Sequence, residues 1–245
     1  MLKVEGLRVR LAGKNVLEEV SFSASSGEVV AIIGPNGAGK SVLLRTIAGL
    51  IKPEEGRILL QGEDLSSFPY KKRVAVISFL PQRVQTNFDF TCEEVVSLGL
   101  RNGNSWRWWL NPEERIRLEK ILKKVGLWEL RFRPFSHLSE GERQRTLIAM
   151  LLIRRTRVFL LDEPASNLDL KYQLEIYSLI RKMADEGSTI ILADHHLHLC
   201  PKFCHRVIFL KKGRVLAEGR PEELLKTQLI RELFDVKGSF LPVVP

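Results

Sequence analysis

The stretch at residues 34–41 combines the residue types that hold a triphosphate. Gly34-Pro-Asn-Gly-Ala-Gly-Lys-Ser41 fits the pattern G-x-x-x-x-G-K-[ST], and it lies between an apolar, β-branched run at 28–33 and an amphipathic run at 41–48. Glycines let consecutive backbone N–H groups turn toward one anion, and the helix that follows adds its own unpaired N–H groups. Lys40 is expected to reach the β- and γ-phosphates, and the Ser41 hydroxyl to bind Mg²⁺. The residues expected to hold the nucleotide are Gly34, Pro35, Asn36, Gly37, Ala38, Gly39, Lys40, Ser41 and Val42. A glycine-rich turn with a chance Lys-Ser is the alternative, and the flanking patterns disfavour it.

Two acidic residues follow the apolar run at 158–161. Asp162 is expected at the carboxyl end of a buried parallel strand, where it can bind Mg²⁺ together with Ser41. Glu163 comes directly after it and is placed to polarise an attacking water as a general base. A carboxylate pair at a strand end is by itself a common solvated loop. The phosphate-loop pattern elsewhere in the chain favours the catalytic interpretation.

Alternating strands and helices must position these residues. Strand patterns occur at 4–11, 16–22, 28–33, 57–61, 74–79, 158–162, 188–194, 207–210 and 214–217. Helical patterns occur at 41–48, 92–99, 112–125, 139–153, 170–186, 221–225 and 229–234. The segment from 91 to 138 reads as helical throughout, so the sequence predicts an α/β fold with an all-helical insertion.

Size and composition narrow the class of protein. The chain has 245 residues and three cysteines, Cys92, Cys200 and Cys204, which cannot all pair and so favour a reducing compartment. The N-terminus lacks the apolar region of a signal peptide, and no apolar run approaches the roughly 18 residues that span a bilayer, so we expect a soluble chain. The net charge of +9 is scattered in short basic pairs. This pattern favours a basic exterior or a nearby membrane surface over nucleic acid.

Four further stretches resemble motifs of the ATP-binding-cassette (ABC) ATPases, and they follow one another in that family's order. Leu138-Ser-Glu-Gly-Glu-Arg-Gln-Arg145 is similar to the signature motif, and 162–169 is similar to the second acidic motif with the D-loop. Gln82 matches the Q-loop glutamine, and His195, within 192–197, matches the switch histidine. The motifs cover nearly the whole chain.

The resemblance implies the ABC ATPase fold: a P-loop NTPase core with an N-terminal antiparallel β-subdomain and an inserted α-helical subdomain. Residues 1–81 and 156–245 would form the core with the β-subdomain, and 82–155 the helical subdomain that carries the Q-loop and the signature helix. The implied cofactors are ATP and Mg²⁺. His195 would contact the γ-phosphate, and Gln82 would bind Mg²⁺ with Ser41 and Asp162 and assist Glu163 in catalysis.

The helix that begins after Ser139 is expected to provide a second anion site through Ser139, Gly141 and Glu142, because a helix N-terminus presents free N–H groups. Ser139 and Glu142 are also spaced as a capping box. One chain cannot easily bring both anion sites onto one γ-phosphate. The resemblance therefore implies a head-to-tail dimer of two copies that sandwich ATP.

The resemblance also implies the partners. They are integral membrane permease subunits and, indirectly, a substrate-binding protein, with no nucleic acid; the chain would be cytoplasmic and peripheral on the inner face of the membrane. The stretches at 93–99, 141–145, 221–225 and 233–236 are most similar to importers of iron-siderophore complexes, haem and cobalamin. A soluble ABC ATPase in cluster assembly or on the ribosome is the alternative. A P-loop enzyme outside the family, such as a small-molecule kinase, would leave the Ser139 helix and His195 unexplained.

Several residues depart from the family pattern. Leu11 stands where an aromatic ring usually stacks on adenine; leucine packs against the base but has no π face, so base selectivity is looser or another residue supplies the stack. Glu140 replaces the first signature glycine and should repel phosphate unless it points to solvent. His196 stands in place of the usual aspartate. Three tryptophans, Trp106, Trp108 and Trp109, either pack inside the helical subdomain or form a docking patch for a membrane partner.

The region from His195 to His205 is dense in residues that can bind metals. Its candidates are His195, His196, His198, Cys200, Cys204 and His205. No C-x-x-C pair or carboxylate completes a closed zinc set, and Pro201 interrupts the run. The sequence therefore favours ordinary packing or solvation over a zinc site.

Overall fold

The computed structural model describes residues 1–82, 90–100, 110–166, 168–225 and 227–236. The N-terminal region forms a four-stranded antiparallel sheet with the order β2-β1-β4-β5. Its strands are β1 (Leu2–Leu11), β2 (Lys14–Ala24), β4 (Glu55–Leu60) and β5 (Glu63–Asp64). The turn between β1 and β2 contains Gly13 at φ +80°, a backbone conformation that glycine adopts without steric cost. The strands predicted at 4–11 and 16–22 are confirmed as β1 and β2.

A second, six-stranded sheet has the order β10-β9-β3-β8-β7-β6. Its strands are β3 (Val29–Ile33), β6 (Ile77–Leu80), β7 (Val158–Asp162), β8 (Thr189–Asp194), β9 (Arg206–Lys211) and β10 (Arg214–Gly219). All neighbours are parallel except β10 with β9. Ile33 pairs with Asp194, and Asp162 pairs with Ala193. The carboxyl ends of β3, β7 and β8 therefore meet at one edge of the sheet.

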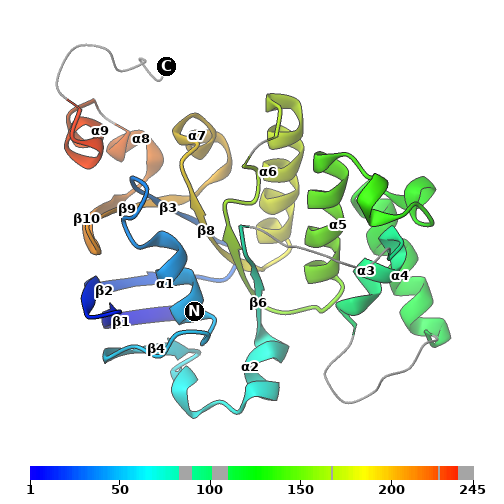
Figure 1. Ribbon diagram of the computed structural model, residues 1–245, viewed down its shortest axis with the longest axis horizontal. Helices are drawn as coiled ribbons and strands as arrows, with labels where there is room; N and C mark the ends of the chain where they lie inside the picture. Colours follow the sequence, from blue (N-terminus) through cyan, green and yellow to red (C-terminus); the bar gives the residue numbers. More distant parts are fainter. Residues whose placement is uncertain (83–89, 101–109, 167, 226, 237–245) are drawn as a thin grey trace.

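Helices surround the six-stranded sheet, and α3, α4 and α5 stand to one side of it in Figure 1. The helices are α1 (Lys40–Ile47), α2 (Tyr70–Val76), α3 (Cys92–Leu98), α4 (Pro112–Lys124), α5 (Glu140–Leu152), α6 (Leu170–Asp185), α7 (Cys200–Phe203), α8 (Pro221–Leu224) and α9 (Thr227–Phe234). Short 3₁₀ turns span Leu65–Ser67, Trp128–Leu130, Phe135–His137 and Leu197–Leu199. None of the helices in the described ranges is long and apolar enough to cross a bilayer.

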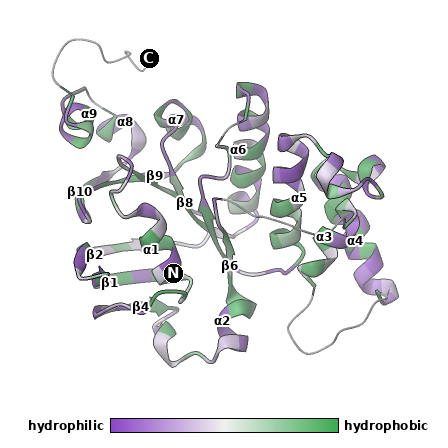
Figure 2. Ribbon diagram, viewed as in Figure 1, coloured by the Kyte–Doolittle hydropathy of each residue, from purple (hydrophilic) through white to green (hydrophobic). Residues whose placement is uncertain are grey.

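The sheet is buried on both faces, which explains the continuous apolar runs in its central strands. Val29, Ala31 and Ile33 face a core shared with α5 and α6, whereas Val30 and Ile32 face a core shared with α1 and the antiparallel sheet. Figure 2 shows β6 and β8 as hydrophobic strands flanked by helices that are apolar on one side. Two hydrophobic cores thus pack against opposite faces of β3. The phosphate loop begins at the carboxyl end of this strand, which is buried on both sides.

One predicted element is wrong in part. The apolar run at 74–79 was expected to be a strand, but residues 74–76 complete α2 and the strand begins at Ile77. The Arg73 guanidinium donates hydrogen bonds to the carbonyls of Leu65 and Gly49, which anchors α2 against two distant turns. A short apolar run fits a helix or a strand equally well, and here tertiary contacts decide.

Other expectations have mixed outcomes. The helix predicted from Ser139 is confirmed as α5, with both hydrogen bonds of the capping box present. The α/β fold is confirmed by the two sheets and the helices around them. The division at residues 82 and 155 stays a prediction. Trp106, Trp108 and Trp109 lie outside the described residues.

Candidate active site

The phosphate loop connects β3 to α1 and can only be built from glycine at key positions. A Cβ atom at Gly34 would lie 2.1 Å from the Leu210 carbonyl oxygen. Gly37 has φ +80° and Gly39 has φ +103°, both in the left-handed region that strains other residues. Gly39 is also the N-cap of α1 and has no side chain to cap it, so the first N–H groups of α1 stay open to an anion.

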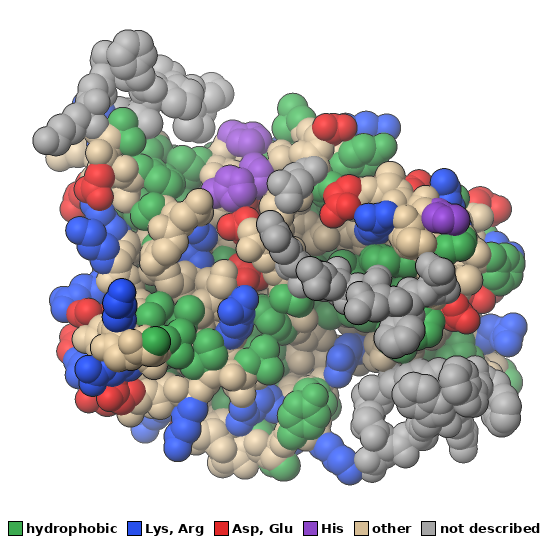
Figure 3. All heavy atoms as spheres, viewed as in Figure 1, with side chains coloured by type: hydrophobic (Ala, Val, Ile, Leu, Met, Phe, Trp, Pro, Cys, Tyr) green, Lys and Arg blue, Asp and Glu red, His purple; other side chains and the backbone are tan. Residues whose placement is uncertain are grey.

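A cavity of about 770 Å³ opens over this loop. It is lined by Val16, Gly34, Pro35, Asn36, Gly37, Ala38, Gly39, Lys40, Ser41, Val42, Gln82, Glu163, His195 and Phe234. The structure therefore brings the whole predicted loop together with three residues predicted from distant motifs. Figure 3 shows histidine side chains gathered beside acidic ones on this view of the molecule.

Lys40 is held inside the loop that it serves. Its side chain belongs to a residue only 6% exposed, and Nζ donates hydrogen bonds to the carbonyl oxygens of Gly34 at 2.7 Å and Pro35 at 3.2 Å. Burial lowers the pKa of Lys40, against the opposing effect of Glu163 and Asp162. The ammonium is thus fixed at the loop, where the charge of a phosphate would favour its ionised form.

Asp162 and Ser41 fit a divalent cation. The Ser41 hydroxyl donates a hydrogen bond to Oδ1 of Asp162 at 3.0 Å. The other carboxylate oxygen, Oδ2, is buried without a partner among the described residues. Burial raises the pKa of Asp162 even though Ser41 donates to it. A hydroxyl beside an unpartnered carboxylate oxygen is the donor set of a hard cation such as Mg²⁺.

Glu163 lies between the two other predicted catalytic residues. Gln82 Nε2 donates a hydrogen bond to Glu163 Oε2 at 2.7 Å, and His195 Nδ1 is 3.8 Å from the same oxygen. Glu163 has φ +50°, and its N–H donates to the Ala193 carbonyl. Backbone strain of this kind persists where surrounding structure enforces it, often at functional sites. The carboxylate is placed to accept a proton from water. Because Gln82 bonds Glu163 here, its additional role as a Mg²⁺ ligand stays a prediction.

The second predicted anion site lies elsewhere. Ser139 caps α5, and its backbone N–H donates a hydrogen bond of 2.8 Å to the Glu142 carboxylate. Gly141 is buried, and a Cβ atom there would meet the Tyr172 ring at 3.0 Å. Among the described residues that line the cavity, none belongs to this helix end. Within one chain, the two predicted anion sites therefore lie apart.

Glu140 points away from the helix axis into solvent. Its side chain is 61% exposed, and its carboxylate lies 3.6 Å from Arg143. We expect Glu140→Gly to leave ATP turnover similar or higher, because the acid points to solvent and a screened negative charge there does not help to bind a phosphate. Phosphate release at saturating MgATP measures this. Glu140→Gln is the matched variant, because it removes the charge and keeps the helix propensity; a large loss of rate in both would contradict the expectation.

The residue predicted to face adenine is not part of the cavity lining. Leu11 ends β1 and is 38% exposed. Val16 of β2 and Phe234 of α9 line the cavity instead. Neither belongs to a motif with a recognisable spacing, so no local signal in the sequence could have identified them. The role of Leu11 as an adenine contact stays a prediction.

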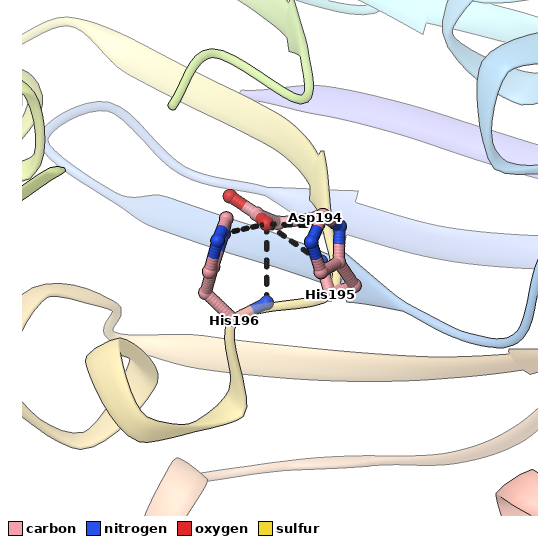
Figure 4. Close-up of side chains that lie close together, drawn as sticks. All are labelled: Asp194, His195 and His196. Carbon is pink, nitrogen blue, oxygen red and sulfur yellow. Dashed lines mark hydrogen bonds and ion pairs between the residues drawn. The ribbon is translucent and has the colours of Figure 1, made fainter. Parts of the chain in front are cut away.

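His195, the predicted switch histidine, donates its backbone N–H to a buried hydrogen-bond network (Figure 4). Asp194 is fully buried and accepts hydrogen bonds from the N–H groups of His195 at 2.6 Å and His196 at 3.1 Å, from His196 Nδ1 at 2.5 Å and from the Tyr177 hydroxyl. His196 Nε2 lies 3.0 Å from Gln173 Nε2 of α6. His196 thus links β8 to α6, directly beside the catalytic edge.

The possible ligand groups of this region are largely occupied. Asp194, His195 and His196 could group their ligand atoms within 4.8 Å, yet Asp194 Oδ1 already accepts three hydrogen bonds. His205 Nδ1 accepts the Val29 N–H at 2.9 Å, and both Cys200 and Cys204 are buried. The packing interpretation stays a prediction, and one premise of it is wrong: Asp194 is a carboxylate that lies within reach of both His195 and His196.

The His196–Asp194 pair predicts a pH-dependent contribution to stability. The hydrogen bond from His196 to Asp194 raises the pKa of His196. A raised pKa in the folded state means that the pair stabilises fully below the unfolded histidine pKa near 6.5 and loses this effect as pH rises through the folded value. His196→Asn should therefore cost about 1.5 kcal/mol at acidic pH and less at pH 9, measured by urea unfolding. Exposed His137→Asn is the control; a gap that widens with pH would contradict the pairing.

Comparison with known proteins now places the chain in a family. Residues 17–166 match the model of the family described as "ABC transporter". The hemin import ATP-binding protein HmuV of Chelativorans sp. (strain BNC1) is 37% identical, with 100% of this chain and 96% of the relative covered. The petrobactin import ATP-binding protein YclP of Bacillus subtilis (strain 168) is 33% identical over 96% of this chain and 93% of the relative. A solved dimer of the ATP-binding cassette MJ0796, in a post-hydrolysis state with ADP and Pi, has a TM-score of 0.78 and 28% identity over 90% of this chain and 99% of that one.

The chain belongs to the ABC transporter family, and its fold is the ABC ATPase fold. It is an ATP-binding protein of that family and an ATPase. The resemblance drawn from the sequence motifs is confirmed.

Proposed function

We propose that the chain powers import of a metal chelate, haem or cobalamin through separate membrane permease subunits. The names of its relatives, which import hemin and petrobactin, support this cargo class. A substrate-binding protein would deliver the cargo from outside. The chain would bind the permease from the cytoplasm, at the inner face of the membrane.

One observation carries the ATPase cycle that we propose: the described residues that line the cavity over the phosphate loop do not include the Ser139 helix end. The phosphate loop, Asp162, Glu163 and His195 line or border it, whereas the Ser139 helix end does not. A second copy arranged head to tail would add its Ser139, Gly141 and Glu142 to the same nucleotide. The dimeric arrangement of the similar MJ0796 cassette supports this arrangement.

The residues of each copy would then divide the chemistry. Lys40 and the open N–H groups of α1 hold the β- and γ-phosphates, and Ser41 and Asp162 hold Mg²⁺, which neutralises charge between those phosphates. Glu163 accepts the proton of the attacking water, while Gln82 and His195 orient that water. Binding across two copies closes the dimer, and hydrolysis removes the bridging charge and reopens it.

Co-purification from membranes tests the transport role. A tagged chain, extracted in mild detergent, should bring down a polytopic membrane protein, and Lys40→Ala should do so equally because this side chain is buried in the phosphate loop. Reconstituted in vesicles with this partner and its binding protein, ATP turnover should rise with hemin, cobalamin or a ferric siderophore. Recovery with ribosomes or soluble proteins alone would contradict the proposal and favour a role outside transport.

A further inference from the structure

We propose that Phe234 of the C-terminal helix α9 provides the aromatic face for the base of ATP, the contact expected at Leu11 from the family pattern. The inference rests on ATP binding in the cavity over the phosphate loop. It makes the C-terminal helix one wall of the nucleotide site and a source of affinity for the base.

The lining of the cavity divides by chemistry. The phosphate-loop backbone, Lys40, Glu163 and His195 make a polar region suited to the triphosphate. A purine needs apolar walls, and Val16 and Phe234 supply them from outside the loop. Among the described residues of the lining, Phe234 is the one that has a phenyl ring. Such a ring can stack on any of the bases.

The turn between β9 and β10 connects this wall to the phosphate loop. The Gly213 N–H donates to the Ala38 carbonyl at 3.0 Å, and the Gly213 carbonyl accepts the Glu18 N–H at 2.8 Å. A Cβ atom at Gly213 would lie 2.3 Å from the Val16 carbonyl oxygen, so the turn presses closely on β2. The turn therefore touches both the loop that holds phosphate and the strand that carries Val16.

The same turn fastens α9. Lys211 lies 2.6 Å from the Asp235 carboxylate through Nζ, and it also donates to the Glu232 carbonyl. These two anchors flank Phe234 in the sequence. Leu233 is fully buried and Ile230 nearly so, which docks the inner face of α9 on the core. The contacts of Lys211 and the burial of Leu233 together hold Phe234 at the cavity.

Leu11 has no comparable placement. It pairs with Lys14 beside the turn of the β1–β2 hairpin, is 38% exposed and does not line the cavity. The family pattern expects an aromatic ring at this hairpin. In this chain the ring that lines the cavity belongs to Phe234 of α9.

Titration calorimetry with two probes tests the proposal on the purified full chain. ATP has a base, whereas inorganic tripolyphosphate offers only the phosphates. Phe234→Ala should weaken ATP binding about tenfold, as expected for loss of one base–aromatic stack, and leave tripolyphosphate binding unchanged. Phe234→Trp should restore ATP binding. Phe132→Ala removes a 64% exposed ring elsewhere and is the matched control for both probes.

The outcomes separate the explanations. Equal weakening of ATP and tripolyphosphate would show that Phe234 only supports the loop and would overturn the inference. Wild-type ATP binding in Phe234→Ala, with weakened binding in Leu11→Ala, would overturn it in favour of the hairpin. A wild-type chain that binds tripolyphosphate but not ATP would refute the ATP assignment itself, a failure that the tripolyphosphate signal makes distinguishable.

Discussion

Glu163→Gln is expected to stop ATP turnover while ATP stays bound. The amide keeps the size of the carboxylate and a contact with Gln82, but it cannot accept the proton of the attacking water. Loss of a general base costs roughly 10²- to 10⁴-fold in rate. In the proposed dimer, hydrolysis would remove the charge that bridges two copies, so the variant should accumulate as a closed dimer.

Two measurements on the same sample check this expectation. Phosphate release should fall to near background, and gel filtration with light scattering should show a dimer in MgATP and a monomer in MgADP. Glu113→Gln, an exposed acid at the start of α4, is the control and should keep both the rate and the monomer. If Glu163→Gln stays monomeric at saturating ATP, the head-to-tail sandwich is wrong, whatever happens to the rate.

Lys40→Ala is expected to abolish nucleotide retention. The ammonium is buried at the loop and donates to the Gly34 and Pro35 carbonyls. Its loss should remove the charge-assisted contact that we expect it to make with the β- and γ-phosphates. Contacts of this strength correspond to a loss of affinity of roughly 100-fold. Equilibrium binding of ATP, followed by calorimetry, measures it.

The controls for Lys40→Ala separate binding from folding. The loop carbonyls lose their donor, so thermal unfolding without nucleotide should be recorded alongside. Lys52→Ala removes an exposed lysine and should bind ATP like the wild type. ATP affinity that is unchanged in Lys40→Ala would mean that the glycine loop is not the nucleotide site.

The sequence alone predicts those parts of the site that are built from residues close together in the chain. The glycines of the loop, the helix behind them and the capping box of Ser139 involve backbone groups within a few residues of one another, and the structure has all of them. The buried strand that ends in Asp162 was predicted for the same reason, because a central parallel strand must be apolar along its length.

Tertiary packing alone decided which distant residues meet. Gln82, Glu163 and His195 come together because the carboxyl ends of β6, β7 and β8 share one edge, and no local pattern sets that register. Residues 74–76 are helical although their apolar run also fits a strand, and Arg73 in the same helix donates to carbonyls of Leu65 and Gly49 outside it. Phe234 lies at the cavity because Lys211 holds the end of α9 and the inner face of α9 is buried against the core. Such contacts depend on how whole helices and strands pack against one another. A short stretch of sequence does not contain both partners, so it cannot predict them.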